Sequence, residues 1–161
     1  AREAGTETIL VVEDDASVRR LVRTALTRAG YTVLEAGEAS EALAVARDAS
    51  GTFDLLLTDV VMPGPSGRAL AEELSTIRPE IPVLYMSGYT DDDIVHHGVH
   101  SQEMPFIQKP FLPGALAAKV RSVLDATRGS ARAAASAARA ARPTPARACV
   151  MSVRELAGTP A

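Results

Sequence analysis

Short apolar runs alternate with longer amphipathic segments along most of the chain, and this pattern predicts an α/β fold. Several of the runs are almost wholly apolar, which is typical of strands that are buried on both faces of a parallel sheet. Five strands are predicted, at Thr8 to Glu13, Thr32 to Ala36, Phe53 to Asp59, Val83 to Ser87 and Pro105 to Gln108. Strands that alternate with helices in this way favour a parallel sheet covered by helices on both faces.

The helices are predicted from apolar residues that recur at helical spacing. Between the first two strands, one helix face is apolar and Gly30 ends the pattern; this face consists of Val18, Leu21, Val22, Ala25 and Leu26. Further helices are predicted at Ser40 to Ala49, Ser66 or Gly67 to Arg78, and Pro113 to Ala126. A helix after the fourth strand is expected to be short, because only Ile94 to His97 follow Asp91-Asp92-Asp93 before Gly98 interrupts the pattern.

The composition of the chain changes at residue 129. Of the 161 residues, 47% are hydrophobic, which is enough for one domain with a proper core. From Gly129 to Ala161 the chain is rich in Ala and Arg and carries a net charge of +4; since the whole chain carries −3, the first 128 residues carry −7. We therefore expect a domain over residues 6–128 and a flexible tail over residues 129–161. The acidic domain argues against direct nucleic-acid binding.

Cysteine content and hydropathy favour a cytoplasmic location. Cys149 is the only cysteine, so no disulfide forms within the chain. No run of about 18 apolar residues is present, and Ala1-Arg2-Glu3-Ala4 is unlike the start of a signal peptide. Because the sequence lacks an initiating Met, we expect it to be a piece of a longer protein, and a membrane-attached parent is compatible with this expectation.

Polar residues follow four of the predicted strands at the same edge of the sheet. They are Glu13-Asp14-Asp15 after the first strand, Asp59 at the end of the third, Ser87 at the end of the fourth and Lys109 after the fifth. In an open parallel sheet, the carboxyl ends of the strands form the edge where ligands bind. Carboxylates that share one crevice raise one another's pKa unless a cation lies between them. The pattern therefore predicts a divalent metal beside Asp59, a carboxylate that can act as a nucleophile.

Each of these residues also has a structural interpretation. Asp14 and Asp15 can cap the first helix, Ser87 can be an ordinary turn residue, and Phe106 can be a core side chain. Their occurrence together with a nucleophile and a lysine, in one arrangement, favours a functional site.

Two further groups of polar residues allow two interpretations each. His96, His97 and His100 lie in an acidic segment with no cysteine nearby, so solvated side chains are favoured over a metal or transfer site. Arg19, Arg20 and Arg23 lie on the solvent side of the first helix and form either a solvated face or a docking surface for an acidic partner helix.

Four segments are similar, in order and spacing, to the motifs of the receiver domain of bacterial two-component response regulators. They are Val11-Val12-Glu13-Asp14-Asp15, Thr58-Asp59-Val60-Val61-Met62-Pro63, Met86-Ser87-Gly88 and Phe106-Ile107-Gln108-Lys109-Pro110-Phe111. The resemblance covers about residues 6 to 128. It implies a flavodoxin-like, doubly wound sheet of five parallel strands in the order 2-1-3-4-5.

The resemblance also implies a role for each site residue. Asp59 would accept a phosphoryl group from the phosphohistidine of a histidine kinase or histidine phosphotransfer domain, with Lys109 and Ser87 assisting catalysis. Asp14, Asp15, Asp59 and the main-chain carbonyl of Val61 would hold Mg²⁺. Ser87 and Phe106 match the switch pair that reports phosphorylation, and the Lys109-Pro110 peptide bond would be cis.

Two other functions are weighed against this one. A Mg²⁺-dependent phosphatase of the haloacid dehalogenase type needs an acid two residues after the nucleophile, where this chain has Val61. A pseudo-receiver that serves only as a scaffold is disfavoured because the site residues are all retained. As a receiver, the domain would catalyse its own phosphorylation and dephosphorylation.

The segment Val83 to Asp91 is similar to the C-terminal receiver of hybrid sensor histidine kinases, although a stand-alone regulator fits as well. In either case we expect a monomer with no membrane segment and no direct contact with nucleic acid.

Overall fold

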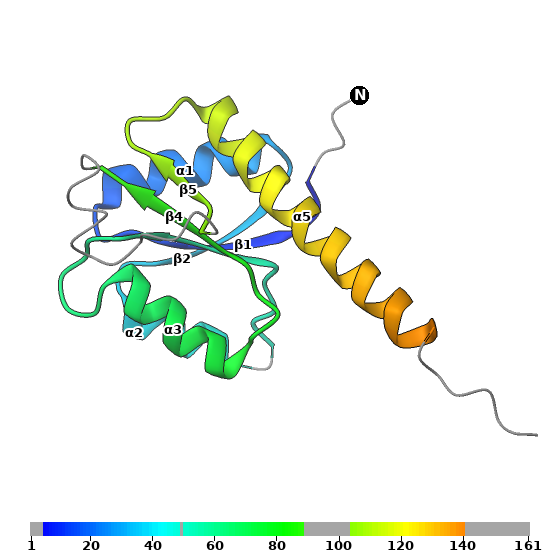
Figure 1. Ribbon diagram of the computed structural model, residues 1–161. Coiled ribbons are helices and arrows are strands. Elements are labelled where there is room, and N and C mark those ends of the chain that lie inside the picture. The colour runs from blue at the N-terminus through cyan, green and yellow to red at the C-terminus, as the bar shows by residue number, and fades with distance from the viewer. Residues whose placement is uncertain (1–4, 49, 89–103, 141–161) are drawn as a thin grey trace, which may run out of the picture. The chain divides into compact units, whose positions relative to one another are not determined.

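The computed structural model describes residues 5–48, 50–88 and 104–140, and its five parallel strands form one sheet (Figure 1). The strands are β1 (Thr8–Val12), β2 (Thr32–Ala36), β3 (Leu55–Asp59), β4 (Val83–Ser87) and β5 (Phe106–Gln108). Their order in the sheet is β2-β1-β3-β4-β5. The predicted fold class and strand order are confirmed.

Helices cover both faces of the sheet (Figure 1). The helices are α1 (Ala16–Arg28), α2 (Ala39–Arg47), α3 (Gly67–Ile77) and α5 (Pro113–Ala140). One core cluster joins α1 and the first part of α5 to one face, and a second cluster joins α2 and α3 to the other. This two-faced burial explains why the central strands are almost wholly apolar.

Strand β1 contributes side chains to the core clusters on both faces of the sheet. Successive side chains of a strand point to opposite faces. Ile9 and Val11 belong to the cluster with α1 and α5, whereas Leu10 and Val12 belong to the cluster with α2 and α3. The run therefore has no solvent-facing position until the strand ends, and this is where the polar residues begin.

Leu21 does not pack inward as the sequence pattern predicts. Val22, Ala25 and Leu26 are buried, but Leu21 is 52% exposed. Each residue of an α-helix is rotated by about 100° from the one before it, so Leu21 falls at the border of the apolar stripe. The stripe is buried from its centre to the opposite border, where Leu26 is fully buried, and it is open to solvent at Leu21.

Helix α5 continues to Ala140, well beyond the predicted end at Ala126. Its buried residues, Leu116, Val120, Val123 and Leu124, all precede that point. The continuation is rich in Ala, the strongest helix former, and it tolerates Gly129 at a cost of about 1 kcal/mol. The chain divides into two compact units, Ala1–Gly129 and Ser130–Ala161, and the elements described above up to Gly129 form the first.

Several predictions concern residues outside the described parts of the chain. They include the short helix around Asp91 to His97, the three histidines and Cys149. None of the helices that the structure describes combines the length and apolar character needed to span a membrane.

Candidate functional site

Asp59 ends β3 and is only 8% exposed. The four residues before it are buried and hold the strand between β1 and β4. The chain turns immediately afterwards: the Val60 N–H donates to the Met86 carbonyl, and the Gly67 N–H donates to the Val60 carbonyl. The carboxylate is therefore fixed at the carboxyl edge of the sheet by the two strands beside it and by the turn that leads into α3.

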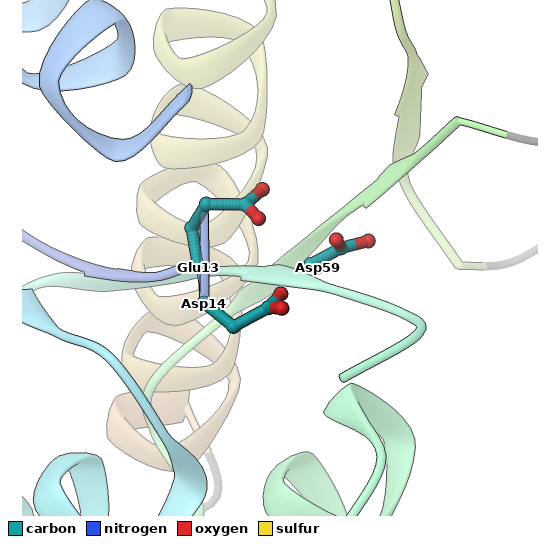
Figure 2. Close-up of side chains that lie close together, drawn as sticks. All are labelled: Glu13, Asp14 and Asp59. Carbon is teal, nitrogen blue, oxygen red and sulfur yellow. The ribbon is translucent and has the colours of Figure 1, made fainter. Parts of the chain in front are cut away.

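Three carboxylates gather at this edge, and we call them the acid cluster (Figure 2): Glu13, Asp14 and Asp59. Glu13 and Asp14 follow β1 directly, and each residue offers an oxygen within 4.8 Å of the others. Hard oxygen donors in this arrangement suit a divalent cation such as Mg²⁺.

Lys109 extends from the end of β5 into the acid cluster. Its Nζ donates to Glu13 Oε2 at 2.6 Å and to Asp59 Oδ2 at 2.9 Å. Burial lowers the pKa of Lys109, but the hydrogen bonds to the two carboxylates outweigh it and leave that pKa above its usual value. The lysine is therefore a permanent positive charge between the two acids. The Lys109-Pro110 peptide bond is cis.

Glu13 is the most buried member of the acid cluster, at 1% exposure. Burial raises the pKa of its carboxyl group, while the hydrogen bond from Lys109 opposes the shift. Sequence reasoning did not include Glu13 among the metal ligands. A signal was present, because Glu13 is the first polar residue after the apolar run from Ile9 to Val12.

Asp15, by contrast, lies apart from the acid cluster. It is the N-cap of α1, and its Oδ1 accepts hydrogen bonds from the N–H groups of Ser17 at 2.8 Å and Val18 at 3.2 Å. These bonds lower the pKa of Asp15. The structure thus places Asp14 with Asp59, as the predicted ligand set requires, whereas Asp15 occupies the alternative capping position and Glu13 takes its place in the cluster.

The remaining predicted residues surround Asp59. The Val61 N–H donates to Asp59 Oδ1 at 3.4 Å, and Val61 itself is exposed. Ser87 ends β4 and is buried, and the Lys109 N–H donates to its carbonyl at 2.6 Å. Phe106, at the start of β5, is 43% exposed.

Two arginines of α1 form ion pairs with Glu35 of β2. Arg23 Nη1 lies 3.0 Å from Glu35 Oε2, and Arg19 Nε lies 3.7 Å from Glu35 Oε1. Arg19 also donates from Nη1 to the Glu13 carbonyl at 2.6 Å. Two of the three arginines thus have partners within the domain, and a docking role for this face remains a prediction.

Comparison with known proteins gives consistent matches to one family. The family model for the response regulator receiver domain matches residues 9–121. Over 122 residues the chain is 36% identical to the sensor kinase CckA of Brucella abortus (strain 2308), covering 76% of this chain and 13% of that protein. It is also 36% identical over 123 residues to the phosphate regulon transcriptional regulatory protein PhoB of Pseudomonas aeruginosa, covering 75% of this chain and 53% of PhoB. The chain thus spans about half or less of these relatives.

Solved structures match the same region. The receiver domain of the hybrid histidine kinase CckA superposes with a TM-score of 0.61 at 36% identity, covering 73% of this chain and 98% of that one. A CheY-like receiver domain protein from Methanospirillum hungatei JF-1 superposes with a TM-score of 0.69 at 27% identity, covering 78% and 99%.

Proposed function

The chain belongs to the response regulator receiver family of two-component signalling, and from this premise we propose that Asp59 is its phosphoacceptor. One observation carries the proposal. Asp59 is a nearly buried carboxylate at the tip of a central strand, with a lysine 2.9 Å away and two further acids beside it. A nucleophile, a cation and a set of metal ligands therefore meet at one point.

In the proposed reaction, a carboxylate oxygen of Asp59 attacks the phosphorus of a phosphohistidine. The bond between phosphorus and the imidazole nitrogen breaks, the imidazole leaves, and an acyl phosphate forms on Asp59. Lys109 supplies positive charge to the phosphoryl oxygens as they approach, because its Nζ already lies beside the attacking carboxylate. The reaction depends on positioning and on charge stabilisation.

The acid cluster fits Mg²⁺, since its donors are carboxylate oxygens that converge within 4.8 Å. We propose that Glu13, Asp14 and Asp59 hold the ion together with the main-chain carbonyl of Val61. When bound, Mg²⁺ supplies positive charge that offsets the repulsion between the acids and the incoming phosphoryl group. Asp15 is better assigned to the helix cap, because its carboxylate already accepts two main-chain hydrogen bonds.

Ser87 and Phe106 are proposed as the residues that report phosphorylation. Ser87 is buried at the end of β4, and Phe106 is exposed on the neighbouring strand, where it pairs in register with Tyr85. Bonding of the Ser87 hydroxyl to the phosphoryl group would let the aromatic ring turn inward. This motion would change the surface at β4 and β5.

The proposed partner is a histidine kinase or a histidine phosphotransfer domain, met by a monomeric receiver in the cytoplasm. The similarity to the CckA receiver supports a receiver that belongs to a hybrid histidine kinase. The similarity to PhoB supports instead a receiver that belongs to a transcriptional regulator. The proposed site and chemistry are the same in both cases.

The test is to incubate the protein with Mg²⁺ and a small acyl phosphate and to measure the intact mass. We expect the gain of one base-labile phosphoryl group by the wild type and none by Asp59→Asn. Asp125→Asn is the matched control, because Asp125 is an exposed acid on α5, and it should be labelled like the wild type. Undiminished labelling of Asp59→Asn would exclude this residue as the acceptor.

A further inference from the structure

We propose that Arg19 is a positioning residue, which holds the peptide unit between Glu13 and Asp14 and thereby sets the geometry of the acid cluster for Mg²⁺. The inference rests on the proposed function, because it concerns the same metal. Arg19 contacts the acid cluster through the main chain: its Nη1 donates to the main-chain carbonyl of Glu13 at 2.6 Å.

The Glu13 carbonyl lies at a point where the sheet no longer supplies a partner. The Glu13 N–H still donates to the Ala36 carbonyl of β2, at 3.2 Å, but β1 ends at Val12. Glu13 is buried, and a buried carbonyl without a donor is costly. Arg19 supplies that donor from one turn inside α1.

The peptide held by Arg19 joins two of the three members of the acid cluster. A peptide unit is planar and rigid, so fixing its oxygen fixes the α-carbons of both Glu13 and Asp14. The directions in which the two carboxylates leave the main chain are then set together. A hydrogen bond to one main-chain oxygen therefore controls two metal ligands.

Arg19 is itself held in place from two sides. Its main-chain N–H donates to the Asp15 carbonyl at 2.8 Å, within the first turn of α1. Its guanidinium group lies against Glu35 of β2, and Glu35 also pairs with Arg23 at 3.0 Å. The guanidinium group thus connects β2 to the end of β1.

Arg23 provides a matched control, because it pairs with the same Glu35, whereas the hydrogen bond to the Glu13 carbonyl comes from Arg19. Both arginines carry a positive charge and pair with Glu35. By Coulomb's law alone, removing either charge strengthens the binding of a cation. A positioning role predicts the opposite sign for Arg19 only, so the direction of the change separates the two explanations.

The experiment uses the full chain and the variants Arg19→Met, Arg19→Gln and Arg23→Met. Mg²⁺ is titrated while the main-chain amide chemical shifts of Asp14 and Asp59 are followed. We expect the dissociation constant of Arg19→Met and Arg19→Gln to rise about tenfold or more, as for other residues that orient metal ligands. Arg23→Met should bind Mg²⁺ as tightly as the wild type or more tightly.

A second measurement needs no metal. Loss of the hydrogen bond should move the carbonyl-carbon chemical shift of Glu13 in both Arg19 variants, and that shift should not change in Arg23→Met. If Arg19→Met does not fold, Arg19→Gln decides the question.

The outcomes distinguish this inference from the proposed function. A wild type without Mg²⁺-dependent shifts at Asp14 and Asp59 would overturn the proposed metal site. A wild type that binds Mg²⁺, together with folded Arg19 variants that bind it equally or more tightly, would overturn the role of Arg19 alone. Equal weakening in Arg23→Met would show that only the ion pair with Glu35 matters, which also contradicts the proposal.

Discussion

Lys109 makes two charge-assisted hydrogen bonds that tie the end of one edge strand to the two strands at the centre of the sheet. The acceptors are Glu13 and Asp59, and Glu13 is almost fully buried. A buried carboxylate is tolerated when a cation compensates its charge. At the scale of the residue, the lysine therefore supports the folded protein as well as the proposed chemistry.

Lys109→Met is expected to lower the free energy of unfolding by about 1–3 kcal/mol at neutral pH without Mg²⁺, because the buried carboxylate loses its charged donor. The pKa of Glu13 is already raised by burial, so the folded state takes up a proton before the unfolded state as the pH falls. The contribution of Glu13 to stability is therefore lost as the pH rises through its pKa in the folded state. The loss of stability in Lys109→Met should accordingly be smaller under acidic conditions, where Glu13 is protonated and carries no charge to compensate. Urea unfolding at neutral and acidic pH measures this.

Lys119→Met is the control for this prediction, since it makes the same chemical change at the other lysine of the chain. Mg²⁺ should restore stability to Lys109→Met and have a smaller effect on the control. Equal losses in both variants, at both pH values, would contradict the assigned role.

At the scale of the element, the junction between β3 and α3 depends on a residue without a side chain. A Cβ at Gly67, the first residue of α3, would lie 1.9 Å from the Asp59 carbonyl oxygen and 2.9 Å from its carbonyl carbon. These are main-chain atoms and cannot move aside as a side chain can. The close approach of α3 therefore fixes the main chain of the proposed acceptor.

Gly67→Ala is expected to destabilise the protein by about 3 kcal/mol, because the new methyl group overlaps with main chain. Gly114→Ala is the control: Gly114 lies in the first turns of α5 with open space around it, so alanine should be neutral or stabilising by up to about 1 kcal/mol. Thermal unfolding of the two variants compares them directly. Similar midpoints would show that the loop before α3 adapts easily.

Helix α5 is anchored by Glu7, a buried acid directly before β1. Glu7 accepts hydrogen bonds from both terminal nitrogens of Arg121, at 3.2 and 2.9 Å, and Arg128 lies 2.8 Å away. The hydrogen bonds from Arg121 lower the pKa of Glu7. The ion pair therefore persists to lower pH than an ordinary carboxylate would allow.

Glu7→Gln should cost about 2 kcal/mol at neutral pH, because two charge-assisted hydrogen bonds are lost. A carboxyl group with a lowered pKa contributes stability above its unfolded value and loses it as the pH falls through the folded value. The difference from the wild type should therefore vanish in strong acid. Glu73→Gln, which breaks the exposed pair with Arg47, should cost less than about 1 kcal/mol in the same unfolding series.

Element positions followed well from sequence because polar residues end apolar runs in this chain. The predicted strand Phe53 to Asp59 contains the observed β3, Leu55–Asp59, and ends at the same residue. The exposure of Leu21 was not predictable from spacing alone, since it depends on how far the sheet extends beneath α1. The length of α5 was not predictable either, since it depends on local helix propensity. The exchange of Asp15 for Glu13 in the acid cluster depends on main-chain geometry at the helix cap, which spacing does not encode.

At the scale of the whole molecule, the compact unit ends at Gly129. A chain that stops there keeps every strand, both core clusters and the contact between Glu7 and Arg128. We expect this shortened chain to unfold within a few degrees of the full chain and to bind Mg²⁺ equally well. Thermal unfolding and Mg²⁺ titration test the boundary, and unfolding of the shortened chain at room temperature would move it towards Ala140.

The contacts of Lys109 also bear on when, during synthesis, the proposed site is complete. The lysine is separated by 96 residues from Glu13 and by 50 residues from Asp59 in the chain, so its strand is the last of the five to leave the ribosome. A nascent chain that has exposed β1 to β4 already carries Asp59 but lacks the lysine of the proposed site. We therefore expect interrupted translation products without β5 not to accept a phosphoryl group, so that phosphorylation would mark a domain that was made to its last strand.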